Sequence, residues 1–190
     1  MGLRRQYEAV SRVKVGGMDE VLFFEHLPVV TLGRATPQRE EPKTIETRKN
    51  GLALLRARRG GRATWHGRGQ IVGYPIIDLK RRRLSPSALV SVVGESLVQW
   101  IREAGTDATF RGDNPAITLQ SGKKVGSVGM ALLGHLSLHG FSLNIRGCDS
   151  PPQIRPCGKD SQDMTSINGE RKEDLSLVAR RIGEILRGRL

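Results

Sequence analysis

Short apolar runs separated by turn-forming residues dominate the first eighty residues and predict strands. Apolar residues lie on both sides of Pro28, and since proline cannot donate to a central sheet ladder, this pattern predicts strand, turn, strand. A polar, proline-punctuated stretch at 35–50 predicts a loop, and a glycine-rich loop is expected before Ile71. The strands predicted in this region are 21–24, 29–32, 52–55 and 71–77.

Two amphipathic helices follow from the 3.6-residue spacing of apolar positions further along the chain. Ser85 can cap a helix and Pro86 suits its first turn, while Gly105 is expected to end it. A second helix is predicted between Leu175 and Leu186. The apolar positions of the first helix are Leu89, Val90, Val93, Leu97, Trp100, Ile101 and Ala104.

Further strands are predicted between the two helices. They cover 116–120, 123–133 and 135–145, with a turn at Ser121-Gly122 and a break at Gly140. Strands interrupted by two long helices indicate an α/β (α+β) fold in which one mixed β-sheet is flanked by helices. A length of 190 residues is typical of a single domain, here 1–190.

The charge of the chain indicates an acidic partner. The formal net charge is +12, with basic clusters at 56–62 and 80–83. Nucleic acid is one such partner, but the few aromatic residues are not interleaved with these clusters, which disfavours a stacking platform. An acidic protein fits the charge equally well. The sequence shows no signal-peptide pattern and no apolar run of membrane-spanning length, so a soluble cytoplasmic protein is expected.

One of the two cysteines stands in an unusual place. Cys157 lies between Pro156 and Gly158 in a polar turn, although an unreactive cysteine is usually buried. Two cysteines make no disulfide framework in a reducing cytosol, so Cys157 is either incidental or a nucleophile. A nucleophilic thiolate needs a nearby cation, and Lys124, which precedes a run of small residues, is the preferred candidate. The alternative is that Lys123 and Lys124 form a solvated hairpin turn.

The histidines do not indicate a metal site. His135 and His139 are four residues apart, but neither they nor the cysteines show the ligand spacing of a known site, so no metal is expected. His66, in the glycine-rich loop, is a better functional candidate, either as a hydrogen-bond donor or as a residue that braces the loop. Cys148 has no motif around it.

Five motifs in sequence order resemble the octanoyltransferases of lipoate biosynthesis. This family transfers octanoyl groups from acyl carrier protein to protein amines and is related to the lipoate and biotin protein ligases. The motifs are EHLPVVTLGR (25–34), RGGRATWHGRGQIVGYP (59–75), KVGSVG (124–129), HGFSLN (139–144), and Pro156-Cys157-Gly158 followed by Thr165-Ser166-Ile167.

The resemblance implies roles for particular residues. Cys157 matches the nucleophile that forms an acyl-enzyme, and Lys124 matches the lysine that lowers the cysteine pKa and moves protons. The loop glycines Gly60, Gly61, Gly67 and Gly69 would let backbone N–H groups approach the thioester oxygen. The implied substrate-binding residues are Arg59, Gly60, Gly61, Arg62, Ala63, Thr64, Trp65, His66, Ser127, Val128, Gly129, Gly140, Phe141 and Ser142.

The resemblance also implies partners. They are octanoyl-acyl carrier protein as donor, and lipoyl domains of 2-oxoacid dehydrogenases and the glycine cleavage H protein as acceptors. Neither half-reaction needs ATP or a cofactor, and a monomer is expected, without nucleic acid or membrane partners.

The chain departs from the family pattern at several positions. It has Arg68 in place of proline, Trp65 in place of tyrosine and Arg62 in place of an uncharged residue, while the segment GDNPAITLQ (112–120) is similar to ATP-dependent ligases. Two alternatives therefore stay open: an ATP-dependent lipoate-protein ligase on the same fold, and a basic nucleic-acid-binding module.

Overall fold

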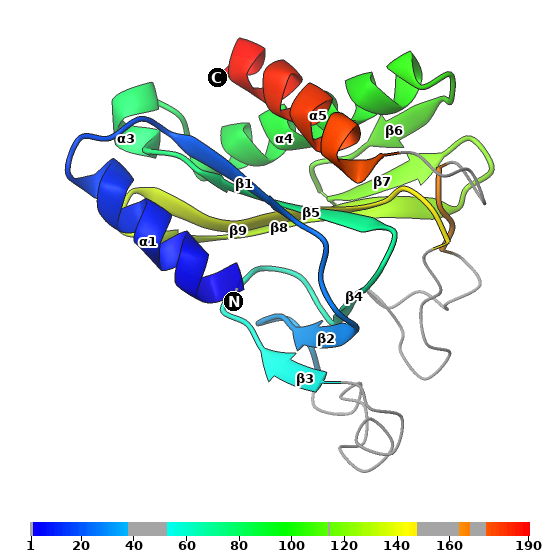
Figure 1. Ribbon diagram of the computed structural model, residues 1–190, viewed down its shortest axis with the longest axis horizontal. Coiled ribbons are helices and arrows are strands. Elements are labelled where there is room, and N and C mark those ends of the chain that lie inside the picture. Colours follow the sequence, from blue (N-terminus) through cyan, green and yellow to red (C-terminus); the bar gives the residue numbers. More distant parts are fainter. Residues whose placement is uncertain (1, 38–52, 114, 148–163, 168–173) are drawn as a thin grey trace.

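The computed structural model describes residues 2–37, 53–113, 115–147, 164–167 and 174–190. Its central layer is a six-stranded sheet in which every neighbouring pair of strands is antiparallel (Figure 1). In spatial order the strands are β1 (Glu20–Phe24), β5 (Gln70–Ile76), β9 (Leu136–Asn144), β8 (Lys124–Leu133), β7 (Ala116–Leu119) and β6 (Ala108–Phe110).

A second, three-stranded sheet lies below the first in Figure 1. It pairs β2 (Val29–Leu32) in parallel with β3 (Ala53–Arg56) and antiparallel with β4 (Thr64–His66). The predicted α/β fold class is thus confirmed, but the strands form two sheets where one was expected, and the parallel pair lies in the small sheet. The three strands of the small sheet are consecutive in the chain, and the loop 57–63 joins β3 to β4.

Two long helices, α4 (Pro86–Glu103) and α5 (Leu175–Arg189), cover one face of the large sheet (Figure 1). The start of α4 is as predicted, since the Ser85 hydroxyl accepts a hydrogen bond from the Ala88 N–H at 3.1 Å. Gly105 follows the end of α4 with φ +83°, as expected of a helix-terminating glycine. The main hydrophobic core lies between these helices and the sheet and includes Leu97, Ile101, Ile117, Val125, Leu143 and Ile182.

The opposite face of the large sheet carries α1 (Gly2–Lys14), which the sequence pattern had not revealed. Ala9, Val10 and Val13 of α1 pack on Ile76, Leu136 and Leu138 in a second, smaller core. A short helix, α3 (Leu79–Arg82), follows β5 and is capped by the Asp78 side chain. None of the described helices has the length and apolarity needed to cross a membrane.

The predicted break at Gly140 takes a different form in the structure. Strand β9 runs without interruption through this glycine, which pairs with Gly129 of β8. The irregularity lies one residue earlier, where His139 has φ 57°, a conformation that is uncommon for a residue with a side chain. Gly140 itself is needed for close packing, since a Cβ there would lie 2.2 Å from the Gly73 carbonyl oxygen.

Candidate active site

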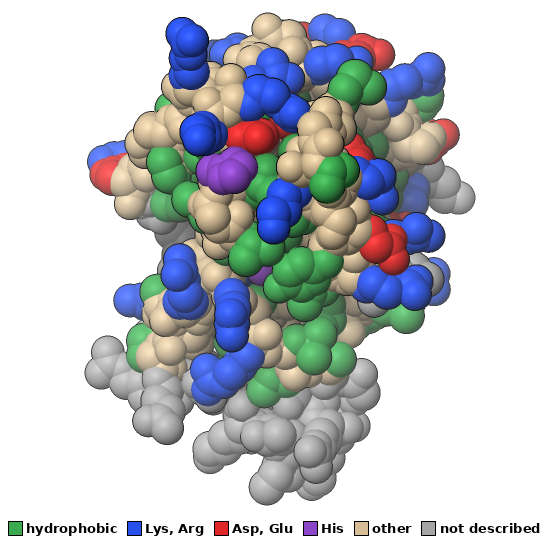
Figure 2. Space-filling model, turned by 90° about the vertical axis from the view of Figure 1, so that its left-hand side faces the viewer, with side chains coloured by type: hydrophobic (Ala, Val, Ile, Leu, Met, Phe, Trp, Pro, Cys, Tyr) green, Lys and Arg blue, Asp and Glu red, His purple; other side chains and the backbone are tan. Residues whose placement is uncertain are grey.

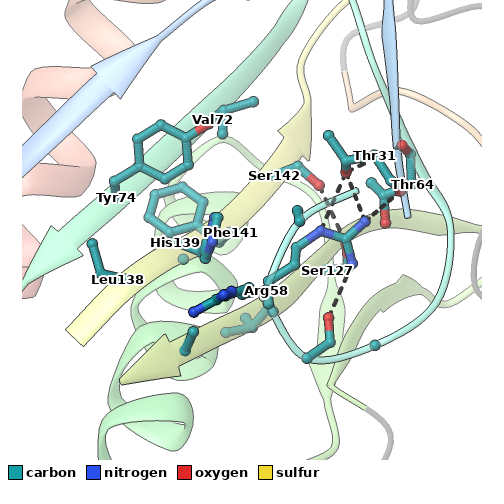
Figure 3. A pocket seen from close by; sticks show the side chains of 18 of the residues that line it. Thr31, Arg58, Thr64, Val72, Tyr74, Ser127, Leu138, His139, Phe141 and Ser142 are labelled. Atoms are coloured by element: carbon teal, nitrogen blue, oxygen red, sulfur yellow. Dashed lines mark hydrogen bonds between the residues drawn. The ribbon is translucent and has the colours of Figure 1, made fainter. Parts of the chain in front are cut away.

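A cavity of about 980 Å³ lies on the face of the large sheet that α4 and α5 leave uncovered (Figure 3). Its walls come from β5, β8, β9, α1, the small sheet and the loop 56–62. Its volume is at the upper end of the range for small-molecule sites. Thirteen of the residues predicted from the motifs line it: Arg59, Gly60, Gly61, Arg62, Thr64, His66, Lys124, Ser127, Val128, Gly129, Gly140, Phe141 and Ser142.

Two predicted pocket residues lie elsewhere. Ala63 and Trp65 pack with Val30 and Leu32 in a small apolar cluster of the three-stranded sheet. Side chains alternate along a strand, so Thr64 and His66 of β4 face the cavity while their neighbours point away from it. Ala63 and Trp65 therefore belong to the core of the small sheet and not to the cavity wall.

A β-bulge determines where Lys124 points. Ser127 pairs with Ala116 and Lys124 pairs with Thr118, so Val125 is an extra residue that has no partner of its own on β7. Residues that are directly paired on neighbouring strands point to the same face of the sheet. Ala116 and Thr118 are two residues apart and therefore share a face, so their partners Ser127 and Lys124 also share a face, which is the one that lines the cavity. In a regular strand, Lys124 would instead point to the helix-covered face, where Val125 is buried. The bulge thus places a lysine in the cavity and an apolar side chain in the core.

Lys124 is almost fully enclosed, with 2% of its surface exposed. Its backbone carbonyl accepts a hydrogen bond from the Thr165 N–H at 2.9 Å, and Met164 forms a bridge to the same residue. In the described part of the chain, no ion pair neutralises the Lys124 ammonium. A buried cation held in this way stabilises a negative charge that forms beside it.

Both cysteines, Cys157 and Cys148, lie outside the described residues. The described chain resumes at Met164, seven residues after Cys157 in the sequence and directly beside Lys124.

Arg59 organises the loop over the cavity. Its guanidinium donates to the carbonyls of Gly60 and Arg62 at 3.0 and 2.8 Å, and to the carbonyl and hydroxyl of Thr31, each at 2.7 Å. Only 8% of Arg59 is exposed. Arg59 thus joins Gly60 and Arg62 of the loop 57–63 to Thr31 of β2. The Gly60 N–H also donates to the Met130 carbonyl of β8 at 3.0 Å, so the loop is held across the large sheet.

Two of the loop glycines do not have a free N–H for an oxyanion. The Gly60 N–H is engaged by Met130, and the Gly69 N–H donates to the Glu25 carboxylate at 2.7 Å. The expectation that all the loop glycines serve the thioester oxygen therefore fails for these two. Their role is structural, and Gly69 has φ +78°, which favours glycine.

His66 is held in one tautomer by a buried network. Its Nδ1 is 2.6 Å from the Gln70 Oε1, and because the Gln70 amide nitrogen donates to the Asn144 oxygen at 2.8 Å, Nδ1 must carry the proton. Asn144 in turn donates to the Thr165 carbonyl at 3.1 Å. The network connects His66 to Thr165 in the segment beside Lys124, and it leaves Nε2 of His66 as an acceptor, 3.4 Å from the Thr31 hydroxyl.

Burial lowers the pKa of the His66 imidazole to about 4, and the Arg59 charge adds to this effect, although the Gln70 hydrogen bond opposes it. His66 is thus neutral at physiological pH. Sequence reasoning named His66 but missed its partners Thr31, Gln70 and Asn144. All three stand inside the quoted motifs, so a search for buried polar residues within those motifs would have found them.

The end of the cavity nearest α1 contains a different group of polar rings. Tyr74 donates or accepts a 2.8 Å hydrogen bond with Nε2 of His26, and its ring meets that of His139 edge-on (Figure 3). Burial lowers the pKa of His139 to about 4 and raises the pKa of Tyr74 to about 12, so both are neutral near pH 7. The buried Gln6 of α1 accepts a hydrogen bond from the His139 N–H at 2.7 Å and so supports the unusual backbone there.

Comparison with known proteins identifies related sequences and structures. An octanoyltransferase of Mycolicibacterium smegmatis is 35% identical over 97% of this chain and 83% of its own length. An octanoyltransferase of Burkholderia multivorans is 33% identical over 79% of this chain, which spans about 62% of that relative. Among solved structures, lipoate-protein ligase A bound with ATP superposes with a TM-score of 0.75 over 97% of this chain and 78% of that one, at 15% identity, which shows a shared fold.

The family model described as the lipoyl protein ligase A/B catalytic domain matches residues 3–178. This match confirms the relationship that the five motifs predicted. The chain therefore belongs to the lipoyl protein ligase A/B catalytic domain family, and its similar sequences include curated octanoyltransferases.

Proposed function

We propose that this chain is an octanoyltransferase of protein lipoylation. It takes the octanoyl group from octanoyl-acyl carrier protein onto Cys157 and passes it to a lysine amine of a lipoyl domain, in the 2-oxoacid dehydrogenases and the glycine cleavage H protein. Residues 1–190 act as one catalytic domain and as a monomer, and the reaction takes place in the cytoplasm with the carrier protein.

The observation that carries this proposal is the placement of Lys124. The β-bulge directs its buried ammonium into a cavity with apolar walls, beside the segment that follows Cys157 in sequence. A ligase that activates its substrate with ATP has no need of a cysteine in this place. The similarity to curated octanoyltransferases supports the same choice.

In the first half-reaction the Cys157 thiolate attacks the carbonyl carbon of the donor thioester. The C–S bond to the donor breaks, and the departing thiolate takes a proton from the Lys124 ammonium. This exchange of one thioester for another is nearly isoenergetic, so it needs no ATP. The buried Lys124 charge stabilises the thiolates and the oxyanion that forms between them.

In the second half-reaction the acceptor lysine amine attacks the acyl-enzyme. Neutral Lys124 removes a proton from the attacking nitrogen, an amide bond forms, and the Cys157 thiolate leaves. Amide formation from a thioester is downhill. The covalent intermediate lets two protein substrates use the same site in turn.

The cavity suits both the acyl chain and the acidic partners. Among the described residues that line it, Arg34, Arg56, Arg58, Arg59, Arg62 and Lys124 are cationic and none is an Asp or Glu. Four of these arginines are exposed. A one-sided distribution of charge steers an acidic carrier protein or lipoyl domain to the site.

A transfer assay tests the proposal. The purified protein is mixed with octanoyl-carrier protein and a lipoyl domain without nucleotide, and the mass of the lipoyl domain is followed. We expect the domain to gain one octanoyl group, and we expect Cys157→Ser and Lys124→Met to abolish the gain. Transfer that requires ATP, or that survives in Cys157→Ser, contradicts the proposal.

A further inference from the structure

Two serine hydroxyls lie side by side on the wall of the cavity, one on β8 and the other on β9. Ser127 and Ser142 are directly paired across these strands, and their Oγ atoms are 3.2 Å apart. Both residues line the cavity (Figure 3). Ser127 shares its face of β8 with Lys124, about two strand steps or roughly 7 Å away. The hydroxyl pair is therefore a neighbour of the buried ammonium.

The loop 57–63 crosses the sheet on the other side of this pair. A Cβ on Gly129 would lie 3.2 Å from the Gly60 carbonyl oxygen and 3.6 Å from Cδ of Arg59, so the loop lies directly over β8 there. Beyond the crossing, exposed leucines at the end of β8 line the cavity. On this side of the molecule, hydrophobic side chains lie among Lys and Arg side chains (Figure 2). The hydroxyl pair thus belongs to the section of the cavity between Lys124 and the crossing.

Burial determines which of the two hydroxyls donates to the other. In the described part of the chain, neither hydroxyl has a second hydrogen-bond partner. Ser142 is only 5% exposed, so if it accepted from Ser127, its own O–H would be buried without an acceptor, which is unfavourable. When Ser142 donates instead, the more exposed Ser127 keeps its O–H for the cavity. The pair therefore presents one donor, the Ser127 O–H, to a group bound in this section.

The proposed reaction needs a hydrogen-bond donor at this place. When a thiolate adds to the carbonyl carbon of a thioester, a C=O bonding pair moves onto the oxygen, and the resulting oxyanion is stabilised by donors more than the starting carbonyl is. The N–H groups of Gly60 and Gly69 are already engaged. The Ser127 hydroxyl is uncharged and donates without losing its proton. The hydrogen bond that it accepts from Ser142 polarises it and makes it a stronger donor.

We propose that Ser127 is a catalytic residue that donates a hydrogen bond to the oxyanion in both half-reactions, and that Ser142 is a positioning residue that orients the Ser127 hydroxyl. The inference rests on the proposed function, because that function places the acyl carbonyl beside Lys124. It divides the work between two side chains: Lys124 stabilises the thiolates and transfers protons, whereas Ser127 acts on the carbonyl oxygen. No covalent bond to Ser127 forms or breaks.

Two reactions of the same cysteine separate these roles. Acylation by octanoyl-carrier protein passes through an oxyanion, whereas alkylation by iodoacetamide forms an S–C bond and releases iodide without one. Both rates are measured by intact mass on excess protein, with mapping of the peptide that contains Cys157. The variants are Ser127→Ala and Ser142→Ala, and the matched control is Ser91→Ala, an exposed serine of α4 on the opposite face of the sheet.

We expect Ser127→Ala to be acylated about a hundredfold more slowly, which is the usual effect of removing one oxyanion donor, and to be alkylated at the wild-type rate within about twofold. Ser142→Ala should slow acylation to a smaller extent, because the Ser127 O–H remains but is no longer held in place. Ser91→Ala should change neither rate. An unchanged alkylation rate also shows that the variant is folded and that its thiolate is intact.

Three results overturn the inference. They are acylation of Ser127→Ala within about threefold of the wild-type rate, acylation and alkylation that fall together, and a larger loss in Ser142→Ala than in Ser127→Ala. A wild-type protein that is alkylated at Cys157 but never acylated contradicts the proposed function itself, and the inference falls with it.

Discussion

The neutral state of His66 makes a quantitative prediction about stability and pH. The folded protein holds the pKa of this imidazole at about 4, whereas an unfolded chain has an ordinary value near 6.5. Because the unfolded state binds the proton more readily, the stability that depends on neutral His66 is fully present above about pH 6.5. It is lost as the pH falls through about 4.

The magnitude follows from the two pKa values. At pH 5 the unfolded imidazole is almost fully protonated and the folded one is about one-tenth protonated, so linkage gives a loss of about 2 kcal/mol relative to pH 7.5. His66→Asn removes the titration but keeps an N–H donor in reach of Gln70. Other titrating groups, including His139, are common to both proteins and cancel in the comparison.

The assay is urea unfolding at pH 7.5 and pH 5.0, for the wild type and for His66→Asn. We expect the free energy of unfolding of the wild type to fall by about 2 kcal/mol more than that of the variant between these pH values. A difference below about 0.5 kcal/mol would mean that His66 titrates normally, and the buried network described around it would be wrong.

Three further predictions concern Lys124, the packing of the large sheet and the support of His139. Lys124→Met should lower octanoyl transfer by at least about a thousandfold. The variant should be as stable as the wild type in urea unfolding, because the substitution removes a buried charge that packing does not need. A fall in the free energy of unfolding of more than about 2 kcal/mol would show a structural role instead. Gly73→Ala should lower the free energy of unfolding in urea by about 1–3 kcal/mol, because the new Cβ would lie 2.2 Å from the Phe141 ring. Adding Phe141→Leu should recover part of this loss in the double variant. Gln6→Leu should cost about 1–3 kcal/mol by leaving the His139 N–H without its acceptor, whereas Gln6→Glu at pH 7.5 should cost less; equal losses would contradict a role for this hydrogen bond.

Local patterns in the sequence were sufficient for the elements whose signals are local. The capping serine and following proline at α4, its terminating glycine, and the spacing of apolar residues in α4 and α5 all operate within a few residues, and these helices form where they were predicted. Helix α1 was missed because its buried face includes the polar Gln6, whose partner on β9 is 133 residues away. The division into two sheets depends on contacts of the same long range.

The candidate site shows the same limit. The motifs identified thirteen of the residues that line the cavity, but simple alternation along 124–129 would have pointed Lys124 to the wrong face of β8. Only the pairing with β7 reveals the bulge that corrects it. Alternation also explains why Ala63 and Trp65, which belong to the same motif as Thr64 and His66, do not line the cavity.

The central claim is that Cys157 carries the acyl group while Lys124 manages its protons. The most direct measurement is the intact mass of the protein after incubation with octanoyl-carrier protein and no acceptor, followed by peptide mapping. We predict one added octanoyl group on the peptide that contains Cys157, absent from Cys157→Ser and discharged by a lipoyl domain. An unmodified wild-type protein, or an adduct that remains in Cys157→Ser, would contradict the account.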